Sequence, residues 1–243
     1  MYVGPHGTPK LADKDSAASV KIASALIKRL PYPLPEAALA EQQIGSVFEQ
    51  RTREFLQASF NLLQHLRPGE WLFQVEGSAN TTARRKTLRK RVGISEFDQY
   101  RHLANLARLL KDNPDLAAVL GRDYLVIPDI IIGRYPVSDA EINRVSPVLD
   151  AREDFPRFTP LRAANNTPVK LILHAIISCK WTLRSDRAQQ IRFEGLNLIR
   201  LRRGHTPHIV AVAAEPLPTR LASLALGTGE LDCVYHFALP ELR

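Results

Sequence analysis

Residues 176–203 hold the side chains of this sequence that are best suited to chemistry. Lys180 ends an apolar run that predicts a strand, and Glu194 lies in the helical stretch that follows. Between them, the sequence RSDR at 184–187 sets two arginines around an aspartate at the expected start of the helix. Carboxylates can hold a divalent metal that activates water for phosphodiester hydrolysis, and a lysine can orient that water. The segment therefore favours hydrolysis of a nucleic acid backbone.

Asp129 is a second acid that the sequence places among apolar residues. It follows Pro128 inside the run YLVIPDIIIG at 124–133, which predicts a strand bent by the proline. A carboxylate buried there alone would be costly, so Asp129 either pairs with another charge or binds a cation. The same argument applies to Lys180, and a direct pair between the two is the structural alternative to catalysis. Ser178 lies two residues before Lys180, so both side chains point to one face of the strand.

The RSDR segment suits the reading of G·C base pairs. Ser185 would make a good helix N-cap and Asp186 suits the positive end of the helix dipole, so capping is the simpler interpretation. Capping leaves Arg184 and Arg187 unexplained, because cations at a helix N-terminus are mildly unfavourable. Arginine can bond bidentately to guanine in the major groove, and a carboxylate can accept from cytosine. A two-fold dimer would read the same pairs on each strand and so specify CCGG.

The elements that must position these residues follow from periodicity and breakers. Predicted helices cover 16–30, 36–66, 97–110, 138–145, 185–203 and 218–226. Predicted strands cover 71–75, 124–133, 169–181, 208–214 and 232–237. Helices dominate 1–120, and strands alternate with helices over 121–243. This order predicts an α/β fold, a mixed central sheet flanked by helices, in a single domain over 1–243.

Composition and charge favour a polyanionic partner. The 243 residues are 45% hydrophobic and 24% charged, which is ordinary for a globular protein, and the formal net charge is +8. That excess of cations favours nucleic acid or an anionic surface. The run at 84–91 is dense in lysine and arginine, and it is either a phosphate-contacting patch or a solvated face.

The sequence predicts a cytoplasmic protein without a membrane partner. No run of 18 apolar residues occurs, and the N-terminal residues do not form a signal peptide. Cys179 and Cys233 lack the spacing of a metal site and are expected to be reduced thiols. His174 lies within an apolar strand and is expected to be a packed core histidine.

Three short motifs occur in the order of a known nuclease site. Pro128-Asp129, then Ser178 and Lys180, then Glu194 resemble the PD…SxK…E variant of the PD-(D/E)xK nucleases. In this respect the chain is similar to the CCGG group of type II restriction endonucleases. The common pattern has an acid two residues before the lysine, whereas that group carries it on the following helix, where Glu194 stands. The resemblance runs from the N-terminal helices to the C-terminus.

The resemblance implies a restriction-endonuclease-like fold and a catalytic residue set. Asp129 and Glu194 would ligate magnesium, two ions per active site in the group, together with the backbone carbonyl of Cys179. Lys180 would position the attacking water and stabilise the pentavalent phosphorus, with Ser178 beside it in the motif. The expected reaction is magnesium-dependent hydrolysis of double-stranded DNA that leaves 5′-phosphate ends.

Further residues are implied by the same group. An acid from an N-terminal helix lies near the site, and Glu49 is the expected match, with Glu54 as fallback and a solvated acid as the alternative. The group places its RSDR segment in the major groove, so Arg184 and Arg187 would read guanine and Asp186 would read cytosine.

The flanking base pairs and the assembly are less well defined by the sequence. Gln42 or Asp13 would touch an outer base pair, with solvated polar side chains as the alternative. The site would be a palindrome containing CCGG, with GCCGGC as one candidate. A homodimer would bind it, and the group also allows a homotetramer. Two other functions stay open, namely another PD-(D/E)xK nuclease of repair or recombination, and a non-catalytic DNA-binding protein of the same fold.

Overall fold

The computed structural model describes most of the chain in several segments. These are residues 16–31, 41–75, 92–113, 115, 118, 127–150, 159–227 and 229–242, with residues 41 and 42 described in their backbone only. Asp13 and the basic run at 84–91 lie outside the described residues, so their predicted roles are not addressed by it. None of the helices within these segments is both long and apolar enough to cross a membrane.

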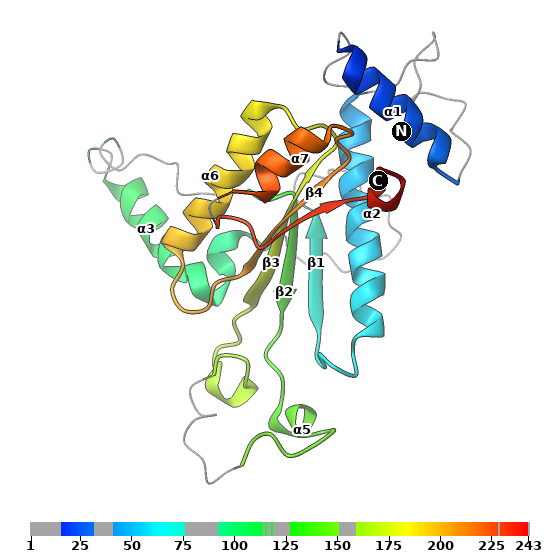
Figure 1. Ribbon diagram of the computed structural model, residues 1–243. Coiled ribbons are helices and arrows are strands. Elements are labelled where there is room, and N and C mark those ends of the chain that lie inside the picture. The colour runs from blue at the N-terminus through cyan, green and yellow to red at the C-terminus, as the bar shows by residue number, and fades with distance from the viewer. Residues whose placement is uncertain are drawn as a thin grey trace. The chain divides into compact units, whose positions relative to one another are not determined.

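The strands of the described segments form a five-stranded sheet (Figure 1). Its strands are β1 (Trp71–Val75), β2 (Ile130–Arg134), β3 (Ile172–Lys180), β4 (His208–Ala213) and β5 (Cys233–His236), and they are hydrogen-bonded in that order. β1 pairs with β2 in antiparallel register, whereas β4 pairs with β5 in parallel register. The sheet is therefore mixed, and the predicted α/β class is confirmed.

Helices precede, separate and follow the strands. They are α1 (Ala17–Arg29), α2 (Glu41–Leu62), α3 (Arg101–Asp112), α5 (Asp139–Ile142), α6 (Ser185–Leu201), α7 (Pro218–Ala225) and α8 (Leu239–Leu242), with short 3-10 turns at Ile94–Glu96, Asp98–Tyr100 and Ala163–Asn165. Ser16 caps α1 by accepting from Ser19 N–H at 3.3 Å, which explains why this helix begins where periodicity predicted. α3 begins four residues later than predicted, after two 3-10 turns.

The chain divides into two compact units, and the strands are distributed between them. Unit 1 comprises Met1–Thr52, Ile177–Leu196 and Ile209–Arg243, and unit 2 comprises Arg53–Ile176 and Asn197–His208. The end of β3, most of α6, nearly all of β4, and all of α7 and β5 belong to unit 1. β1, β2, α3 and the beginning of β3 belong to unit 2.

The core of unit 1 joins α6 and α7 to β4 (Figure 1). Its fully buried members are Leu183, Ile191, Ala211, Ala213 and Leu224. The alanines of β4 let the leucine and isoleucine side chains of the two helices approach the sheet closely, as dense core packing requires. This packing fixes the start of α6, because Leu183 lies two residues before the first helical residue, Ser185.

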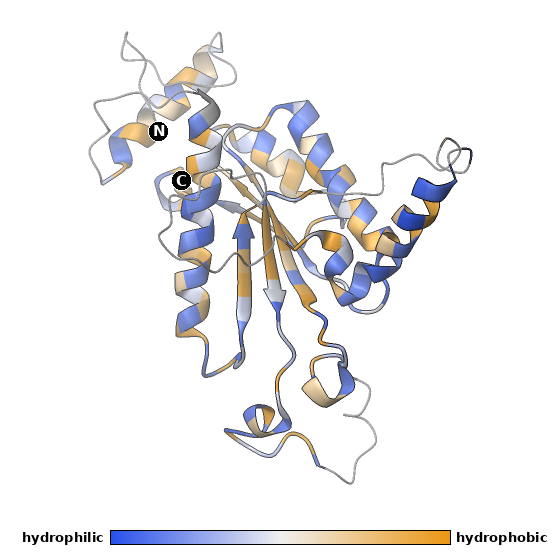
Figure 2. Ribbon diagram, turned by 180° about the vertical axis from the view of Figure 1, so that it is seen from behind, coloured by the Kyte–Doolittle hydropathy of each residue, from blue (hydrophilic) through white to orange (hydrophobic). Residues whose placement is uncertain are grey.

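The core of unit 2 is built around the segment before α3. Phe97 and Tyr100 are fully buried, and the Tyr100 hydroxyl donates to the backbone carbonyl of Leu198 at 3.0 Å. Gly133 in β2 makes room for Phe97, because a Cβ there would lie 2.8 Å from the Phe97 ring. Figure 2 shows the strands coloured largely as hydrophobic, in agreement with this buried centre.

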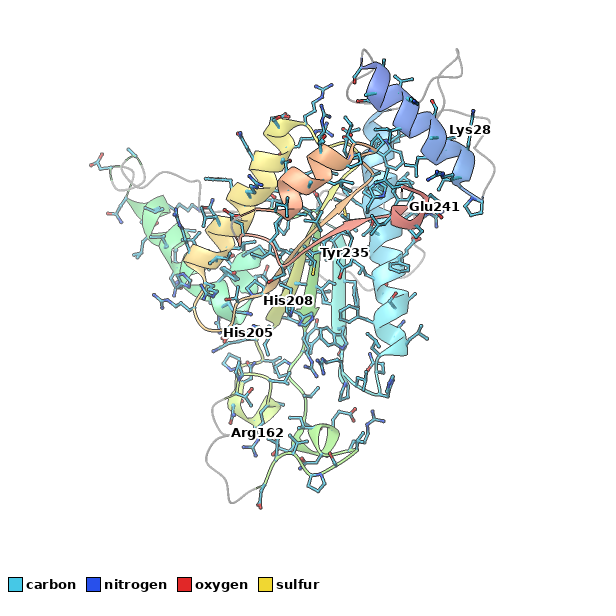
Figure 3. The ribbon with its side chains drawn as sticks, viewed as in Figure 1. Lys28, Arg162, His205, His208, Tyr235 and Glu241 are labelled. Atoms are coloured by element: carbon cyan, nitrogen blue, oxygen red, sulfur yellow. The ribbon has the colours of Figure 1, made fainter. Side chains whose placement is uncertain are left out.

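An aromatic cluster with histidines forms a second contact region of unit 2. His174 of β3 packs edge-on against Trp71 at 4.9 Å and against His208 at 5.2 Å, measured between ring centroids. His208 lies at the start of β4, close to His205 (Figure 3). Burial, followed by the nearby charges of His208 and Arg134, lowers the pKa of His174 to about 4. His174 is thus a packed, neutral histidine at ordinary pH.

Candidate functional site

The end of β3 presents Lys180 from a buried strand. Ser178 and Cys179 are buried, and Lys180, the last residue of the strand, is half-buried. The backbone N–H of Ala214, just after β4, donates to the Lys180 carbonyl at 3.1 Å. The backbone of Lys180, the last residue of β3, is therefore held by the segment that follows β4. This bond fixes the main-chain position from which the Lys180 side chain extends.

Three aromatic rings bring the start of α2 to the residue after Lys180. Phe48 of α2 packs edge-on against Trp181, with ring centroids 5.5 Å apart, and Trp181 stacks on Phe237 at 6.1 Å. Trp181 is half-buried in this contact, as expected of a packing residue. Glu49 directly follows Phe48 and is also half-buried. The structure thus brings the segment of Glu49 next to that of Lys180.

Glu54, the fallback acid on α2, has a different environment. It belongs to unit 2 and lies 3.9 Å from the guanidinium of Arg53. Glu49 belongs to unit 1 with Lys180 and Glu194. Of the two acids, Glu49 is therefore the one whose compact unit also contains the end of β3.

Glu194 is half-buried on α6, one turn after Gln190. The Gln190 side-chain amide donates to the Glu194 carboxylate at 2.8 Å, which limits the orientations that the carboxylate can adopt. At the next residue, Gly195, α6 lies close to two other segments of unit 1. A Cβ on Gly195 would lie 2.8 Å from the Glu230 carbonyl oxygen and 3.2 Å from the Ile209 side chain. The absence of a side chain at Gly195 therefore lets α6, which carries Glu194, pack closely against the Glu230 backbone and Ile209.

All four residues of the RSDR segment, at the start of α6, are exposed to solvent. The Arg187 guanidinium folds back and donates to the Thr182 hydroxyl at 3.0 Å, so this long side chain is partly ordered before any ligand arrives. The Arg184 carbonyl accepts from Ala188 N–H at 3.0 Å and begins the helix, which places Arg184 at the N-cap. The interpretation of Ser185 as the N-cap is therefore wrong, since Ser185 is the first helical residue.

A buried glutamate that the sequence analysis missed holds the turn in front of this segment. Glu215, 2% exposed, accepts from Leu183 N–H at 2.8 Å and from Leu217 N–H at 3.2 Å. The Arg220 guanidinium lies 3.6 Å from the same carboxylate. A signal was present in the sequence, because Glu215 is a lone acid at the end of an apolar strand. This is the argument that singled out Asp129.

The remaining predicted residues are placed individually. Asp129 directly precedes β2 in unit 2, half-buried and next to the buried Pro128. Gln42 lies on the first turn of α2, and its side chain is outside the described residues. Within the described segments, no three His, Cys, Asp or Glu side chains form a group that could hold a metal ion. The predicted donors are two carboxylates and one backbone carbonyl, an oxygen-only set of the kind that magnesium prefers.

Comparison with known proteins gives consistent matches over the whole chain. The model of the NgoMIV restriction enzyme family matches residues 5–243. The type II restriction enzyme NgoMIV of Neisseria gonorrhoeae is 48% identical over 238 residues, covering 98% of this chain and 78% of that protein. Among solved structures, the Bse634I restriction endonuclease is 14% identical with a TM-score of 0.41, covering 97% of this chain and 84% of its own. The type IIF endonuclease Bse634I with cognate DNA is 13% identical with a TM-score of 0.35, covering 92% and 90%.

Proposed function

Because the chain belongs to the NgoMIV restriction enzyme family, we propose that it hydrolyses both strands of DNA at a palindrome that contains CCGG. The class itself, a type II restriction endonuclease of the NgoMIV kind, was predicted from the sequence and is confirmed by the match over residues 5–243. The recognition site, the metal and the assembly are the new parts of the proposal. They are proposed from the resemblance of the PD…SxK…E and RSDR motifs, together with the exposed side chains that follow β3.

The observation that carries the proposal is the strand–turn–helix of β3 and α6. It holds Lys180 by its backbone, exposes Arg184, Asp186 and Arg187 a few residues later, and carries Glu194 farther along the same helix. Arg184 and Arg187 are assigned to guanine O6 and N7, and Asp186 to cytosine N4. Reading and cutting groups on one rigid unit keep the scissile phosphate in register with the bases that are read.

Asp129, Glu194 and the Cys179 carbonyl are assigned as the ligands of magnesium, with two ions per active site. When bound, magnesium supplies activation of water and neutralisation of charge at phosphorus. Asp129, which directly precedes β2, is assigned from the order of the PD…SxK…E motifs in the sequence. Lys180 orients the attacking water and stabilises negative charge on the phosphate oxygens. Ser178 supports Lys180 from within the strand, and Glu49 contributes a further carboxylate from α2.

The DNA partner sets the expected assembly and compartment. A palindrome is read by a two-fold dimer in which each copy supplies one RSDR segment, and a dimer of dimers remains compatible with this geometry. Gln42 is assigned to an outer base pair, with GCCGGC as a candidate for the full site. We assign this activity to the cytoplasm, where Cys179 and Cys233 are expected to stay reduced.

Digestion of a sequenced plasmid with magnesium, followed by run-off sequencing of the ends, tests the proposed function. We expect cuts at one fixed position within every palindrome of a single CCGG-containing sequence, with 5′-phosphates and a 5′ extension. Omission of magnesium should abolish the cuts. Ends scattered over the plasmid, or cuts at palindromes without CCGG, would refute the proposed specificity. A preference for branched or damaged DNA would instead indicate a repair or recombination nuclease.

A further inference from the structure

Glu215 uses its buried carboxylate to connect two loops of unit 1. One oxygen accepts from Leu183 N–H at 2.8 Å, in the turn that leaves β3. The other accepts from Leu217 N–H at 3.2 Å, in the loop that leads to α7. The preceding residue, Ala214, donates its own N–H to the Lys180 carbonyl at 3.1 Å. Two consecutive residues after β4 therefore hold the chain on both sides of Trp181 and Thr182.

The anchored residue, Leu183, directly precedes the exposed RSDR segment. Its side chain is fully buried with Ile191 and Leu224 in the core of unit 1. Leu183 is therefore fixed twice, by apolar packing of its side chain and by the bond from its backbone to Glu215. The next residue, Arg184, is exposed, and Arg187 folds back on Thr182, which precedes Leu183. The base-reading side chains thus extend from a point that has little freedom to move.

The charge of Glu215 fits its position physically. A carboxylate that is 2% exposed is costly unless its oxygens are bonded and its charge is offset. Two backbone amides supply the bonds, and the positive end of the α6 dipole and the Arg220 guanidinium offset the charge. A carboxylate can accept through both oxygens, whereas an amide side chain has only one acceptor oxygen. Because the two loops bond different oxygens of Glu215, a glutamine in the same position would have an acceptor for only one of them.

We propose that Glu215 is a positioning residue for base recognition, which holds the turn at Leu183 so that Arg184 and Arg187 meet the bases in the correct register. The inference rests on the proposed function, because it assumes that these arginines read DNA. Its effect is on the ratio of affinities for the correct and incorrect sequence, since base contacts need exact placement whereas phosphate contacts tolerate small shifts.

The test replaces Glu215 by glutamine and measures discrimination. Dissociation constants without magnesium are determined for a duplex containing CCGG and for a scrambled duplex of equal length, and the thermal midpoint is measured in parallel. Glu215→Gln keeps the size of the side chain but loses one acceptor oxygen. We expect the ratio of the two constants to fall about tenfold, the scale of one charge-assisted hydrogen bond, while the scrambled duplex binds as before.

A second variant keeps the test decisive if glutamine prevents folding. Glu215→Asp retains the charge but shortens its reach, so the carboxylate can satisfy only one of the two loops. We expect the same direction of change with a smaller drop in the ratio. The proposal is overturned if a folded Glu215 variant shows the wild-type ratio, even when its thermal midpoint is lower.

Gln99 offers a matched control at the other end of β3. It is 3% exposed and also holds the backbone of a strand, because it bonds both the N–H and the carbonyl of Leu173. Gln99→Leu should lower the thermal midpoint and leave the ratio unchanged. If Gln99→Leu lowers the ratio as much as Glu215→Gln does, the effect is general destabilisation and the inference fails.

Arg187→Ala, measured in the same assay, separates the inference from the function beneath it. If Arg187→Ala keeps the preference for CCGG, the proposed base reading is wrong. If Arg187→Ala loses the preference while both Glu215 variants keep it, base reading stands and only the role of Glu215 is refuted.

Discussion

Buried polar side chains hydrogen-bond to the backbone at both ends of β3, but the side chain at one end is neutral and the side chain at the other is an acid. At the first end, in unit 2, Gln99 donates to the Leu173 carbonyl at 2.8 Å and accepts from its N–H at 3.0 Å. Just beyond the second end, in unit 1, Glu215 accepts from Leu183 N–H at 2.8 Å. The neutral amide satisfies a donor and an acceptor together, whereas the carboxylate only accepts and brings a negative charge.

The difference follows what each end presents to solvent. Gln99 lies beside the buried rings of Phe97 and Tyr100, where an uncompensated charge would be costly. Glu215 lies behind a turn that displays Arg184 and Arg187, where a buried negative charge is offset by its surroundings. We therefore expect substitutions at the first end to change stability, and substitutions at the second end to change cleavage and specificity.

Lys180→Ala should give the largest effect, a loss of cleavage. If cleavage were unchanged, the second end of β3 would not have the catalytic role that distinguishes it from the first. Loss of the ammonium group should reduce cleavage by at least about 10²–10⁴-fold, the usual contribution of a positioned catalytic group. Affinity for a CCGG duplex and the thermal midpoint should stay close to wild type. The measurement is plasmid nicking and linearisation over time, beside a binding assay. Undiminished nicking would remove Lys180 from the active site.

Arg187→Ala should lower discrimination between sequences by roughly 1–3 kcal/mol, which is about 5- to 150-fold in the affinity ratio. The physical reason is the loss of a bidentate contact to guanine. Arg200→Ala is the control, because Arg200 is another exposed arginine on α6, in its last turn. It should leave the ratio unchanged. Equal weakening of binding to CCGG and scrambled duplexes by Arg187→Ala would indicate phosphate contacts only.

Gly195→Ala tests how closely α6, the helix that follows the second end of β3, is packed. The added methyl group would lie 2.8 Å from the Glu230 carbonyl oxygen, so α6 must shift, at a cost of about 1–3 kcal/mol in the free energy of unfolding. Gly45→Ala on α2 is the matched control, because no atom lies within 4 Å of its Cβ position. That variant should be stabilised by about 0.4–1 kcal/mol. Urea unfolding measures both, and equal free energies for the two variants would contradict the close approach of α6.

His174→Phe should give the smallest effect at neutral pH, because the contribution of His174 to stability changes only at acid pH. Burial lowers the pKa of His174 to about 4 in the folded protein, below the ordinary value of 6.5, so the unfolded chain binds more protons between these values. Stability conferred by neutral His174 is therefore complete above pH 6.5 and is lost as the pH falls toward 4. The loss is on the order of 2 kcal/mol, because the ring is partly solvated. Urea unfolding at pH 7 and 5 should show a shallower decline for His174→Phe; identical declines would contradict this role.

The sequence was sufficient wherever local pattern and tertiary packing agree. The run ILHAIISCK and the RSDR segment gave β3 and the start of α6, because apolar runs and helical period are local properties. The same pattern placed Phe97 in a helix. In the structure Phe97 is extended and fully buried, and it packs at Gly133 of β2, 36 positions later in the chain. A contact this remote overrides helical propensity and cannot be read from the local period.

The candidate site also contains residues that the sequence predicts and residues that only the fold reveals. Lys180, Glu194 and the reading residues follow from motifs whose members lie close together in the sequence. Glu215 stands out in the sequence as a lone acid at the end of an apolar strand, but its partners are backbone amides that no motif can record, so its role was not predicted. The resemblance predicted Glu49 ahead of Glu54, whereas the packing of Phe48 against Trp181, beside Glu49 and Lys180, is a contact that only the fold brings together.

Side-by-side measurement of Lys180→Ala and Arg187→Ala on one CCGG duplex and one scrambled duplex tests the central claim most directly. The claim is that the end of β3 cuts and the turn after it reads. Lys180→Ala should keep the wild-type affinity ratio while losing cleavage, and Arg187→Ala should lose the ratio. The claim is contradicted if both variants lose the ratio equally, or if neither loses it.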